Sequence, residues 1–508
     1  MTKMSAADFI TGEAAPGVAT LDVTAVNSKE TRELYAGRKK IYSKLAHGTF
    51  RRLKWIVMAV TLGIYYALPW FRWERGSELP NQAILADVEN GRIFIGPIDI
   101  WPQEFYYITG ILVLSALVLF LITSALGRVW CGYTCPQTVW TDLMIAIERF
   151  WQGDRNTRIR LDKEPWSATK IYKKSMTHVS WILVSILTGG AFVFYFRDAP
   201  TLAGEFLTGT APMIAYLFLG IFAFTTYLLG AIAREQVCIY MCPWPRIQGA
   251  MIDHHTVLVS YRPERGEPRG PARKGPDHKI DWSNRGDCID CNACVAVCPT
   301  GIDIRDGSQL ECIQCALCID ACNDIMAKVD RPQGLIAYDT IAKREASERG
   351  VHEPWKFVRA RTGLYAGLIV LVTAIMAVAF LGRTSLQVNV VGDRAPLYVM
   401  LSDGGVRNTY TVKILNKQHN TRRVQLSLGG SDGKSIEGAQ FRLLGIDEVN
   451  PVIEVPTDAV RELKLFVTVP KASLSQLTPP STPLIITVRD VEGESQMARR
   501  TVFQSPVK

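Results

Sequence analysis

Twelve cysteines are the residues of this 508-residue chain whose spacing points most clearly to chemistry, and they fall into four groups. Two groups repeat the pattern Cys-x2-Cys-x2-Cys-x3-Cys. They are Cys288, Cys291, Cys294 and Cys298, followed by Cys312, Cys315, Cys318 and Cys322. Thiolates at every third residue of a tight loop can wrap successive corners of an iron–sulfur cubane, and bacterial two-cluster ferredoxins use this run.

The fourth cysteine of each run is expected to bind the cluster that the other run holds. The sequence therefore predicts two [4Fe–4S] clusters with interleaved ligands. The first would take Cys288, Cys291, Cys294 and Cys322, and the second would take Cys312, Cys315, Cys318 and Cys298. Two zinc sites are the alternative, but zinc is commonly bound by paired Cys-x2-Cys knuckles rather than by triple runs.

The other two groups belong to a hexapeptide pattern that occurs twice, as CGYTCP at 131–136 and as CIYMCP at 238–243. Both copies read Cys-x-Tyr-x-Cys-Pro and follow an apolar stretch, and they supply Cys131, Cys135, Cys238 and Cys242. If each membrane helix continues into its motif, its two cysteines share a helix face, because residues four apart are neighbours there. Four sulfurs would then converge near the edge of the membrane.

Four interpretations of these thiols stay open. They could bind copper, because soft thiolates favour Cu(I). They could also oxidise as two dithiol pairs, hold another iron–sulfur cluster, or simply pack as small buried residues. Repetition of the whole motif favours a metal or redox role over packing. Tyr133 and Tyr240 are either interface anchors or members of an electron path. Asp253, His254 and His255 could supply a metal ligand, but a solvated or capping role is favoured, and we leave them unassigned.

Five stretches are nearly free of charge, and each is about long enough for a helix to cross roughly 30 Å of hydrocarbon. They are Trp55–Trp70, Phe105–Leu126, Val179–Phe196, Pro212–Ala233 and Leu364–Leu381. Buried helices of a soluble core do not account for stretches such as the second one, which has 22 residues without a charge. The sequence therefore predicts a multi-pass membrane protein.

Basic residues predict the orientation, because loops rich in Lys and Arg stay on the cytoplasmic side. Most of them precede the first stretch or lie in the second-to-third and fourth-to-fifth connections. We therefore expect a cytoplasmic N-terminus and ferredoxin domain, and a C-terminal segment outside. All twelve cysteines then lie in a reducing compartment, where they act as ligands or redox groups. Much of the net charge of +9 comes from the excess of Lys and Arg in these cytoplasmic segments. The positive charge therefore does not indicate nucleic acid as a partner.

Beyond Arg383, short runs of alternating or continuous apolar residues are separated by Gly, Asp, Asn and Pro, which is typical of a β-sandwich. The expected fold class is a multi-domain membrane protein, with an α-helical transmembrane bundle of about five helices, a two-cluster ferredoxin domain and this sandwich. The expected order is a mobile tail (1–50), a four-helix transmembrane region (51–260), an irregular linker (261–283), the ferredoxin domain (284–332), a connector (333–362), the fifth helix (363–382) and the external domain (383–508).

This combination resembles the CcoG/RdxA/FixG family of cytochrome c oxidase accessory proteins. The agreement runs from about residue 35 to the end of the chain and includes RGEPRG at 265–270. The resemblance implies a location in the bacterial inner membrane and a periplasmic, immunoglobulin-like C-terminal domain. It also implies a Cu(II)-to-Cu(I) reductase that supports assembly of cbb3-type oxidase. Cys131, Cys135, Cys238 and Cys242 would then handle copper, and the eight ferredoxin cysteines would bind the clusters.

The partners expected on this basis are the lipid bilayer, cbb3 assembly factors or copper transporters and chaperones, and a cytoplasmic electron donor. A homo-oligomer is also compatible with the sequence.

Two other functions stay open. One is a NapH-like or NosR-like relay that takes electrons from quinol, and the other is a copper chaperone or assembly scaffold without enzymatic activity.

Overall fold

The computed structural model describes residues 10–27, 39–76, 79–272, 280–418, 420–430, 438–446, 451–457, 459–493 and 495–506. The chain forms two compact units. The first comprises Met1–Glu74 and Pro80–Met376, and the second comprises Arg75–Leu79 and Ala377–Lys508.

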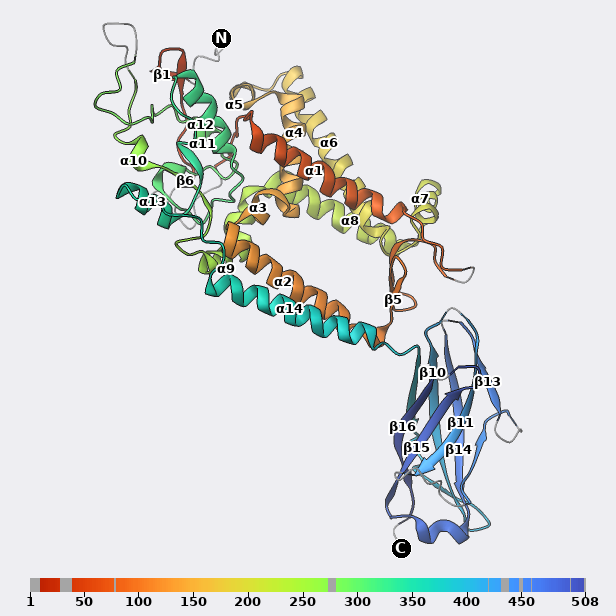
Figure 1. Ribbon diagram of the computed structural model, residues 1–508. Helices are drawn as coiled ribbons and strands as arrows, with labels where there is room; N and C mark the ends of the chain where they lie inside the picture. Colours follow the sequence, from red (N-terminus) through yellow and green to blue (C-terminus); the bar gives the residue numbers. More distant parts are fainter. Residues whose placement is uncertain are drawn as a thin grey trace. The chain divides into compact units, whose positions relative to one another are not determined.

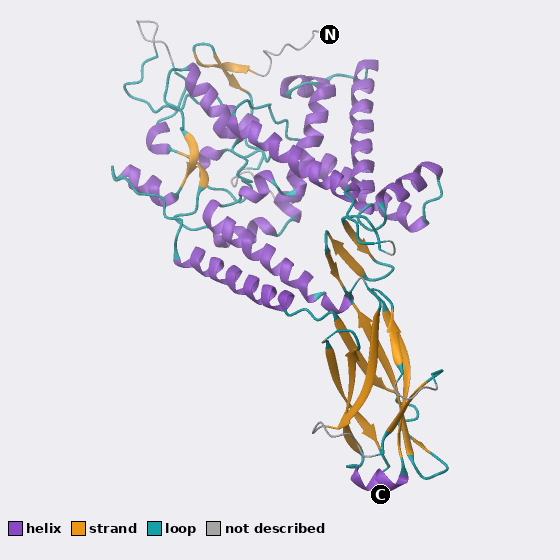
Figure 2. Cartoon of the chain, turned by 45° about the vertical axis from the view of Figure 1, so that its right-hand side comes forward, coloured by secondary structure: helices purple, strands orange, loops and turns teal. Residues whose placement is uncertain are grey.

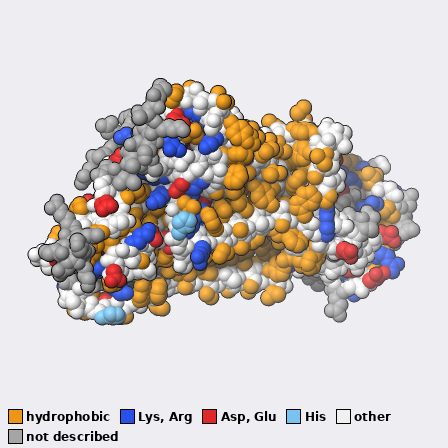
Figure 3. Space-filling view, turned by 90° about the horizontal axis from the view of Figure 1, so that it is seen from above, with side chains coloured by type: hydrophobic (Ala, Val, Ile, Leu, Met, Phe, Trp, Pro, Cys, Tyr) orange, Lys and Arg blue, Asp and Glu red, His pale blue; other side chains and the backbone are white. Residues whose placement is uncertain are grey.

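Five helical segments are long and apolar enough to cross a membrane, as the sequence predicted. They are Thr49–Trp70 (α1 Thr49–Ala67 and η2 Leu68–Trp70), Pro102–Leu126 (η3 Pro102–Glu104 and α2 Tyr106–Leu126), α6 Ala168–Val193, Met213–Ala233 (α8 Met213–Thr226 and the π-helix η4 Tyr227–Ala233) and α14 Ala360–Leu381. In a space-filling view, hydrophobic side chains form a broad field over the helices, and charged side chains gather toward one end of this unit (Figure 3). This distribution fits a bundle that is surrounded by lipid.

Close helix packing in the bundle depends on small residues, as is usual where helices meet within a membrane. α2 and α14 lie side by side (Figures 1 and 2), and a Cβ at Gly110 would lie only 2.5 Å from the sulfur of Met376. α6 packs against α8, where a Cβ at Gly189 would lie 2.8 Å from the carbonyl oxygen of Leu219. A larger residue at Gly189 would push α6 and α8 apart, because it meets backbone atoms, whereas at Gly110 the flexible Met376 side chain would have to move.

The second and fourth membrane helices end before they reach the cysteine motifs, so the condition under which the two cysteines of a motif would share one helix face is not met. Gly127 and Arg234 break them with φ angles of 64° and 47°. After each break the chain forms a short helix that carries the first cysteine, α3 Val129–Tyr133 in one copy and the π-helix η5 Val237–Met241 in the other. α4 Pro136–Gln152 and α9 Trp244–Met251 then follow the second cysteine. The repeat is therefore helix, break, short helix and second helix.

Two further helices and a small sheet lie in the connections between the membrane helices. α5 Arg155–Lys163 follows α4, and α7 Ala199–Thr208 lies between α6 and α8. β3 Ile84–Asp87, β4 Arg92–Ile95 and β5 Ile98–Ile100 form an antiparallel sheet between the first two membrane helices.

The ferredoxin fold extends beyond the 284–332 segment that contains its cysteines. Besides α11 Ala293–Val297, η6 Ile304–Asp306 and α12 Leu317–Lys328, it includes two strands that pair antiparallel, β6 Leu258–Tyr261 and β7 Ile336–Asp339. α10 Pro263–Gly266 and α13 Ile341–Glu348 flank these strands. The first part of the expected irregular linker is therefore built into this fold, whereas its residues 273–279 lie outside the described ones.

Part of the expected mobile tail is also ordered. β1 Ile10–Ala15 and β2 Val18–Leu21 form an antiparallel hairpin. Ala14, Ala15 and Val18 are buried in the same hydrophobic core as Cys288 and Ile289. The amide of Leu21 donates a hydrogen bond of 3.2 Å to the carbonyl of Cys291. The small apolar side chains of the hairpin therefore cover one cysteine loop; residues 1–9 and 28–38 lie outside the described part of the chain.

The second unit is a β-sandwich of antiparallel sheets, as expected from the alternating pattern. One sheet has the order β12-β14-β10-β8, with β9 paired to β10, and the other has the order β13-β11-β15-β16. Side chains of β10 and β14, such as Val412 and Leu465, alternate into a core shared with Ile486 of β15. The strands are β8 Leu386–Gly392, β9 Val399–Met400, β10 Val406–Asn416, β11 Arg422–Gly430, β12 Gln440–Leu443, β13 Val452–Val455, β14 Val460–Val469, β15 Ser481–Asp490 and β16 Gln496–Gln504.

Candidate iron–sulfur and thiol site

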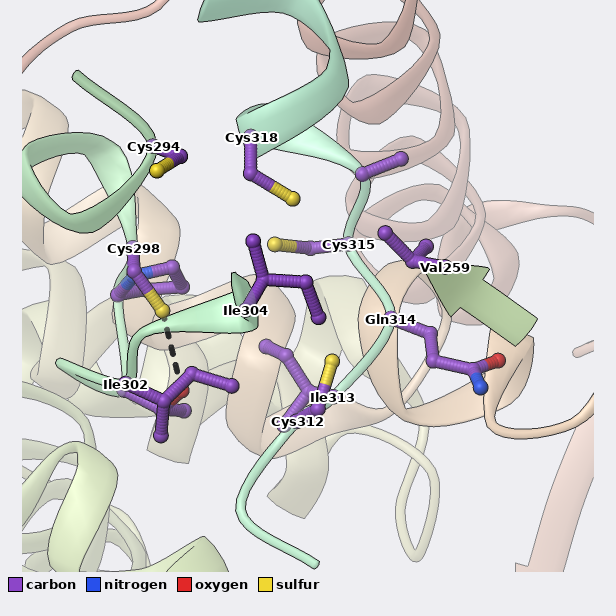
Figure 4. A pocket seen from close by; sticks show the side chains of 13 residues that line it. Val259, Cys294, Cys298, Ile302, Ile304, Cys312, Ile313, Gln314, Cys315 and Cys318 are labelled. Atoms are coloured by element: carbon purple, nitrogen blue, oxygen red, sulfur yellow. Dashed lines mark hydrogen bonds between the residues drawn. The ribbon is translucent and has the colours of Figure 1, made fainter. Parts of the chain in front are cut away.

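The eight ferredoxin cysteines come together in the two interleaved sets that the sequence predicts. One small cavity is lined by Cys288, Cys291, Cys294 and Cys322. The other is lined by Cys298, Cys312, Cys315 and Cys318, with Cys294 at its margin, and sulfur atoms from both loops face its interior (Figure 4). The fourth cysteine of each run thus lies in the cradle built by the other run.

The backbone of both cysteine loops is shaped alike. Asp290 and Asn292 flank Cys291 with positive φ angles, and Gln314 and Ala316 do the same around Cys315. Such conformations are uncommon for residues other than glycine and concentrate at functional sites. They turn main-chain amides toward sulfur: Cys291 accepts a hydrogen bond from the amide of Ala293, Cys312 from that of Gln314, and Cys315 from that of Leu317.

These loops fit cubane clusters better than single ions. Across the residues that the structure describes, no three His, Cys, Asp or Glu side chains converge tightly enough to hold one metal ion. A cubane separates its four thiolates more widely than a single tetrahedral ion does. The eight cysteines, their amide hydrogen bonds and the small cavities between them are therefore the donor set that two [4Fe–4S] clusters need.

Burial favours the neutral thiol at these cysteines as long as no metal is bound. It raises the pKa of Cys312 and Cys322 to about 12, and it raises the pKa of Cys294 and Cys318 well above the ordinary thiol value. Because thiolates are the ligands, binding of a cluster has to release these protons.

The first membrane motif contacts the second cluster loop directly. A Cβ at Gly132 would lie 2.8 Å from the carbonyl oxygen of Ile313 and 3.1 Å from the Cα of Cys315, so only glycine allows this approach. The hydroxyl of Tyr133 donates a hydrogen bond of 3.3 Å to the carbonyl of Cys315, and Tyr133 is buried. Tyr240 is 49% exposed at the equivalent position of the second motif. Tyr133 is therefore built into the cluster loop, whereas Tyr240 faces the surface.

The four motif thiols lie within electrostatic reach of one another. Burial raises the pKa of Cys131 to about 12, and the neighbouring thiols Cys135 and Cys242 add to the shift. Burial likewise raises the pKa of Cys238 to about 12, with contributions from Cys135, Cys131 and Cys242. The thiol of Cys131 donates a hydrogen bond of 3.2 Å to Oε1 of the buried Gln248. The structure thus brings the two motifs together, as expected from the repeat.

The second motif also borders the ferredoxin fold. Cys238 lines a small cavity together with Pro299 and Thr300, which directly follow Cys298, and with Ile313 of the second cluster loop. Both thiol motifs therefore meet the same cluster cradle. This arrangement could not be read from the sequence, because the motif and the loop are far apart along the chain.

Arg128 is a site residue that the sequence analysis missed. Its side chain is buried, and its Nη1 donates hydrogen bonds to the carbonyls of Leu310 and Cys312 while its Nη2 donates one of 2.6 Å to Pro245. Burial lowers the pKa of this guanidinium, and Cys312 and Cys131 oppose that shift. In the sequence, an arginine directly after an apolar stretch indicates only the cytoplasmic end of a membrane helix. The contact of Arg128 with the cluster loop was therefore not predictable.

The Asp253, His254 and His255 stretch forms a turn. Asp253 accepts hydrogen bonds from the amide of His255 (2.9 Å) and from the hydroxyl of Thr256 (3.1 Å). It also forms an ion pair with Arg359, just before α14. These contacts stabilise a turn rather than cap a helix, and they tie the segment after α9 to the residue just before the fifth membrane helix.

Three family models match segments of the chain. A 4Fe-4S dicluster domain matches residues 233–341, a 4Fe-4S binding domain matches residues 108–153, and an IG-like fold at the C-terminal of FixG matches residues 376–506. Together with the membrane helices and the cysteine cradles, these matches define a membrane-bound iron–sulfur electron-transfer protein with an immunoglobulin-like domain.

The chain belongs to the FixG/RdxA family, which confirms the resemblance noted in the sequence. It is 46% identical over 489 residues to nitrogen fixation protein FixG of Rhizobium meliloti, covering 90% of this chain and 92% of that protein. It is 50% identical over 402 residues to protein RdxB of Cereibacter sphaeroides, with 78% and 84% covered. Protein RdxA of the same organism is 46% identical over 446 residues, with 87% and 91% covered.

Proposed function

We propose that this protein reduces Cu(II) to Cu(I) at the four motif thiols Cys131, Cys135, Cys238 and Cys242. The observation that supports this most strongly is the direct contact of the first motif with the second cluster loop, through Gly132 and Tyr133. A redox site has to lie close to its electron source, and this contact leaves no intervening layer of protein. Such a reductase is an oxidoreductase whose substrate is the metal ion.

The two [4Fe–4S] clusters, when bound, supply electrons one at a time, and Cu(II) takes up one electron to become Cu(I). The motif thiols provide the soft ligands that favour the reduced ion. Gln248 orients the thiol of Cys131 by accepting its hydrogen bond. Arg128 supplies a buried positive charge between Cys131 and Cys312, which favours thiolates on both sides.

Anaerobic copper reduction tests the proposal. The protein is purified with its clusters, reduced and freed of reductant, and Cu(I) is followed with a chromogenic chelator after addition of Cu(II). We expect the wild type to form Cu(I) and the Cys135→Ser/Cys242→Ser variant to lose this activity while keeping its clusters. Thr134→Ser/Met241→Leu, which changes the residues before these cysteines, is the matched control. Undiminished Cu(I) formation by the cysteine variant would refute the thiol site.

An additional iron–sulfur cluster at the motif thiols is a second candidate. The 4Fe-4S binding domain model at residues 108–153 includes Cys131 and Cys135. Iron and acid-labile sulfide analysis separates the two: two clusters give about eight iron atoms per chain and three give about twelve. A content that falls from about twelve to about eight in the Cys135→Ser/Cys242→Ser variant would favour the cluster.

The wider role that we propose is support of copper insertion during assembly of a cbb3-type oxidase, from the bacterial inner membrane. In this role the ferredoxin domain is cytoplasmic, the immunoglobulin-like domain is periplasmic, and the electron donor is a cytoplasmic protein. Deletion of the gene should lower the copper content of the oxidase. Cluster oxidation without Cu(I) formation would instead favour a quinol-linked relay, and tight copper binding without reduction would favour a chaperone.

A further inference from the structure

A cavity of about 220 Å³ lies between three elements of the membrane bundle, apart from the cysteine cradles. Its walls are Glu148 and Gln152 of α4, Lys174, His178 and Trp181 of α6, Ala231 and Ile232 of η4, and the adjoining Arg234 and Lys40. A single water needs about 10–15 Å³ of such space. The cavity can therefore hold a polar group much larger than one water molecule.

The side chains around this cavity carry more positive than negative charge. Glu148 is 1% exposed and pairs with Arg234 (2.9 Å), Arg158 (3.1 Å) and Lys40 (3.3 Å). Asp162 pairs with Lys40 and with Lys174. Four cations thus surround two carboxylates, and both lysines border the cavity itself. A built site with excess positive charge fits an anionic ligand.

The position of the cavity fits an amphiphile. It lies near the start of α6 and near the end of η4, the last part of the fourth membrane segment. These two membrane segments are antiparallel, so the cavity is at one end of the pair. The outer face of α6 continues from there with the exposed side chains of Val179, Ile182 and Leu183. Basic pockets between membrane helices at the cytoplasmic side are typical binding places for phosphate-bearing lipid headgroups.

The π-helix η4 supplies the third wall. π-helical turns are rare and frequently mark functional sites, because the wider turn displaces side chains from their helical positions. The turn ends with a 2.8 Å hydrogen bond from the amide of Arg234 to the carbonyl of Leu229. The Arg234 side chain borders this cavity on one side and the small Cys238 cavity on the other. A ligand held here would therefore also fix one wall of the thiol site.

We propose that this cavity binds a phosphate-bearing anion, either the headgroup of an anionic phospholipid or free phosphate. Lys40 and Lys174 contact the phosphate oxygens, while the buried Arg158 and Arg234 provide the surrounding positive charge. The acyl chains of a lipid would then lie along the exposed face of α6.

Native mass spectrometry of the full-length protein tests this proposal. The protein is released from micelles doped with equal amounts of phosphatidylglycerol and phosphatidylcholine of the same acyl chains, and a separate sample receives inorganic phosphate alone. We expect phosphatidylglycerol to be retained roughly tenfold better, since each lysine contributes to the attraction. Retention of phosphate in the separate sample, without lipid preference, would identify free phosphate as the source.

Variants assign the binding to the cavity. Lys40→Gln and Lys174→Gln should each reduce the preference, whereas Lys173→Gln, the neighbouring lysine that does not line the cavity, should keep it. Equal retention of both lipids together with no bound phosphate would overturn the proposal. So would an equal loss in the Lys173 variant, or a co-purified quinone in place of phosphate. Lys40→Gln and Lys174→Gln change different segments of the chain, so either variant assigns the binding to the cavity if the other folds poorly.

Discussion

The hydroxyl of Tyr133 donates a hydrogen bond to the main-chain carbonyl of Cys315 over 3.3 Å. Tyr338 lies beside Tyr133, and the hydroxyl of Tyr338 donates to the carbonyl of Gln314 over 3.1 Å. Two tyrosines thus secure consecutive carbonyls of the second cluster loop, and one of them lies inside the first thiol motif. The motif and the loop are therefore a single packed unit.

Tyr133→Phe should loosen this unit without opening a cavity. The change removes one hydrogen bond to a buried carbonyl, which costs about 1 kcal/mol in the free energy of unfolding. We expect a lower melting temperature and slower copper reduction. Tyr172→Phe, at a position that is 58% exposed, should change neither. Equal effects of the two variants would show that the contact with Cys315 is unimportant.

Gly132→Ala should disturb the cluster loop more strongly. The new Cβ would meet the carbonyl oxygens of Ile313 and Gln314 at 2.8 and 3.0 Å, and these are backbone atoms that cannot rotate away. We expect partial loss of the visible absorption of the clusters and of copper reduction. Gly220→Ala is the control, because a Cβ there meets nothing within 4 Å. An intact spectrum with normal activity in Gly132→Ala would contradict the packing described above.

Arg128→Gln tests the buried charge beside the second cluster loop. Removing the cation should make the nearby cluster harder to reduce, because reduction adds negative charge that Arg128 stabilises. We expect a more negative midpoint potential in a redox titration followed by electron paramagnetic resonance. The exposed Arg246 lies on α9 near the same region, and Arg246→Gln should leave the potential unchanged. A wild-type potential in Arg128→Gln would restrict Arg128 to a structural role.

The main features of the fold were predictable because they rest on local patterns. Apolar length predicted the five membrane helices, and alternation predicted the sandwich. The spacing of the cysteines predicted both interleaved sets, including the exchange of Cys298 and Cys322 between the cradles. Each of these signals depends on residues close together in the sequence or on a pattern with a well-understood geometry.

The remaining features depend on contacts between distant segments. Gly127 could signal the end of α2, but Arg234 has a positive φ that its residue type does not suggest. The β1–β2 hairpin is short and only weakly apolar, so its order comes from packing on the cluster loop. The approach of Gly132 to Ile313 likewise depends on where the ferredoxin fold docks. Such features follow from tertiary packing and leave no local pattern.

The immunoglobulin-like unit should fold when it is expressed alone as residues 383–506, because it has its own core. Val488→Ala removes two methyl groups from a fully buried position and should cost about 2 kcal/mol. Val460→Ala makes the same change at a position that is 49% exposed and should cost well under half of that. Chemical denaturation followed by circular dichroism measures both. A noncooperative transition of the isolated unit would show that it needs the rest of the chain.

Acid should weaken the ion-pair network around Glu148. Burial alone would raise the pKa of this carboxyl, but Arg234, Arg158 and Lys40 outweigh burial and hold it at about 2, below its ordinary 4.5. A lowered pKa in the folded state stabilises the protein above pH 4.5, and this contribution is lost as the pH falls from 4.5 toward about 2. Its size is on the order of 3 kcal/mol.

Unfolding in micelles, followed between pH 6 and pH 3 by tryptophan fluorescence, measures this loss. Glu148→Gln should be less stable at neutral pH by about 3–5 kcal/mol, because buried cations lose their partner. Its stability should also fall less steeply with acid, since the group that titrates is gone. Glu164→Gln, which changes a half-exposed carboxylate on the surface, should keep the wild-type acid slope. An identical slope in Glu148→Gln and the wild type would mean that other carboxylates cause the acid sensitivity.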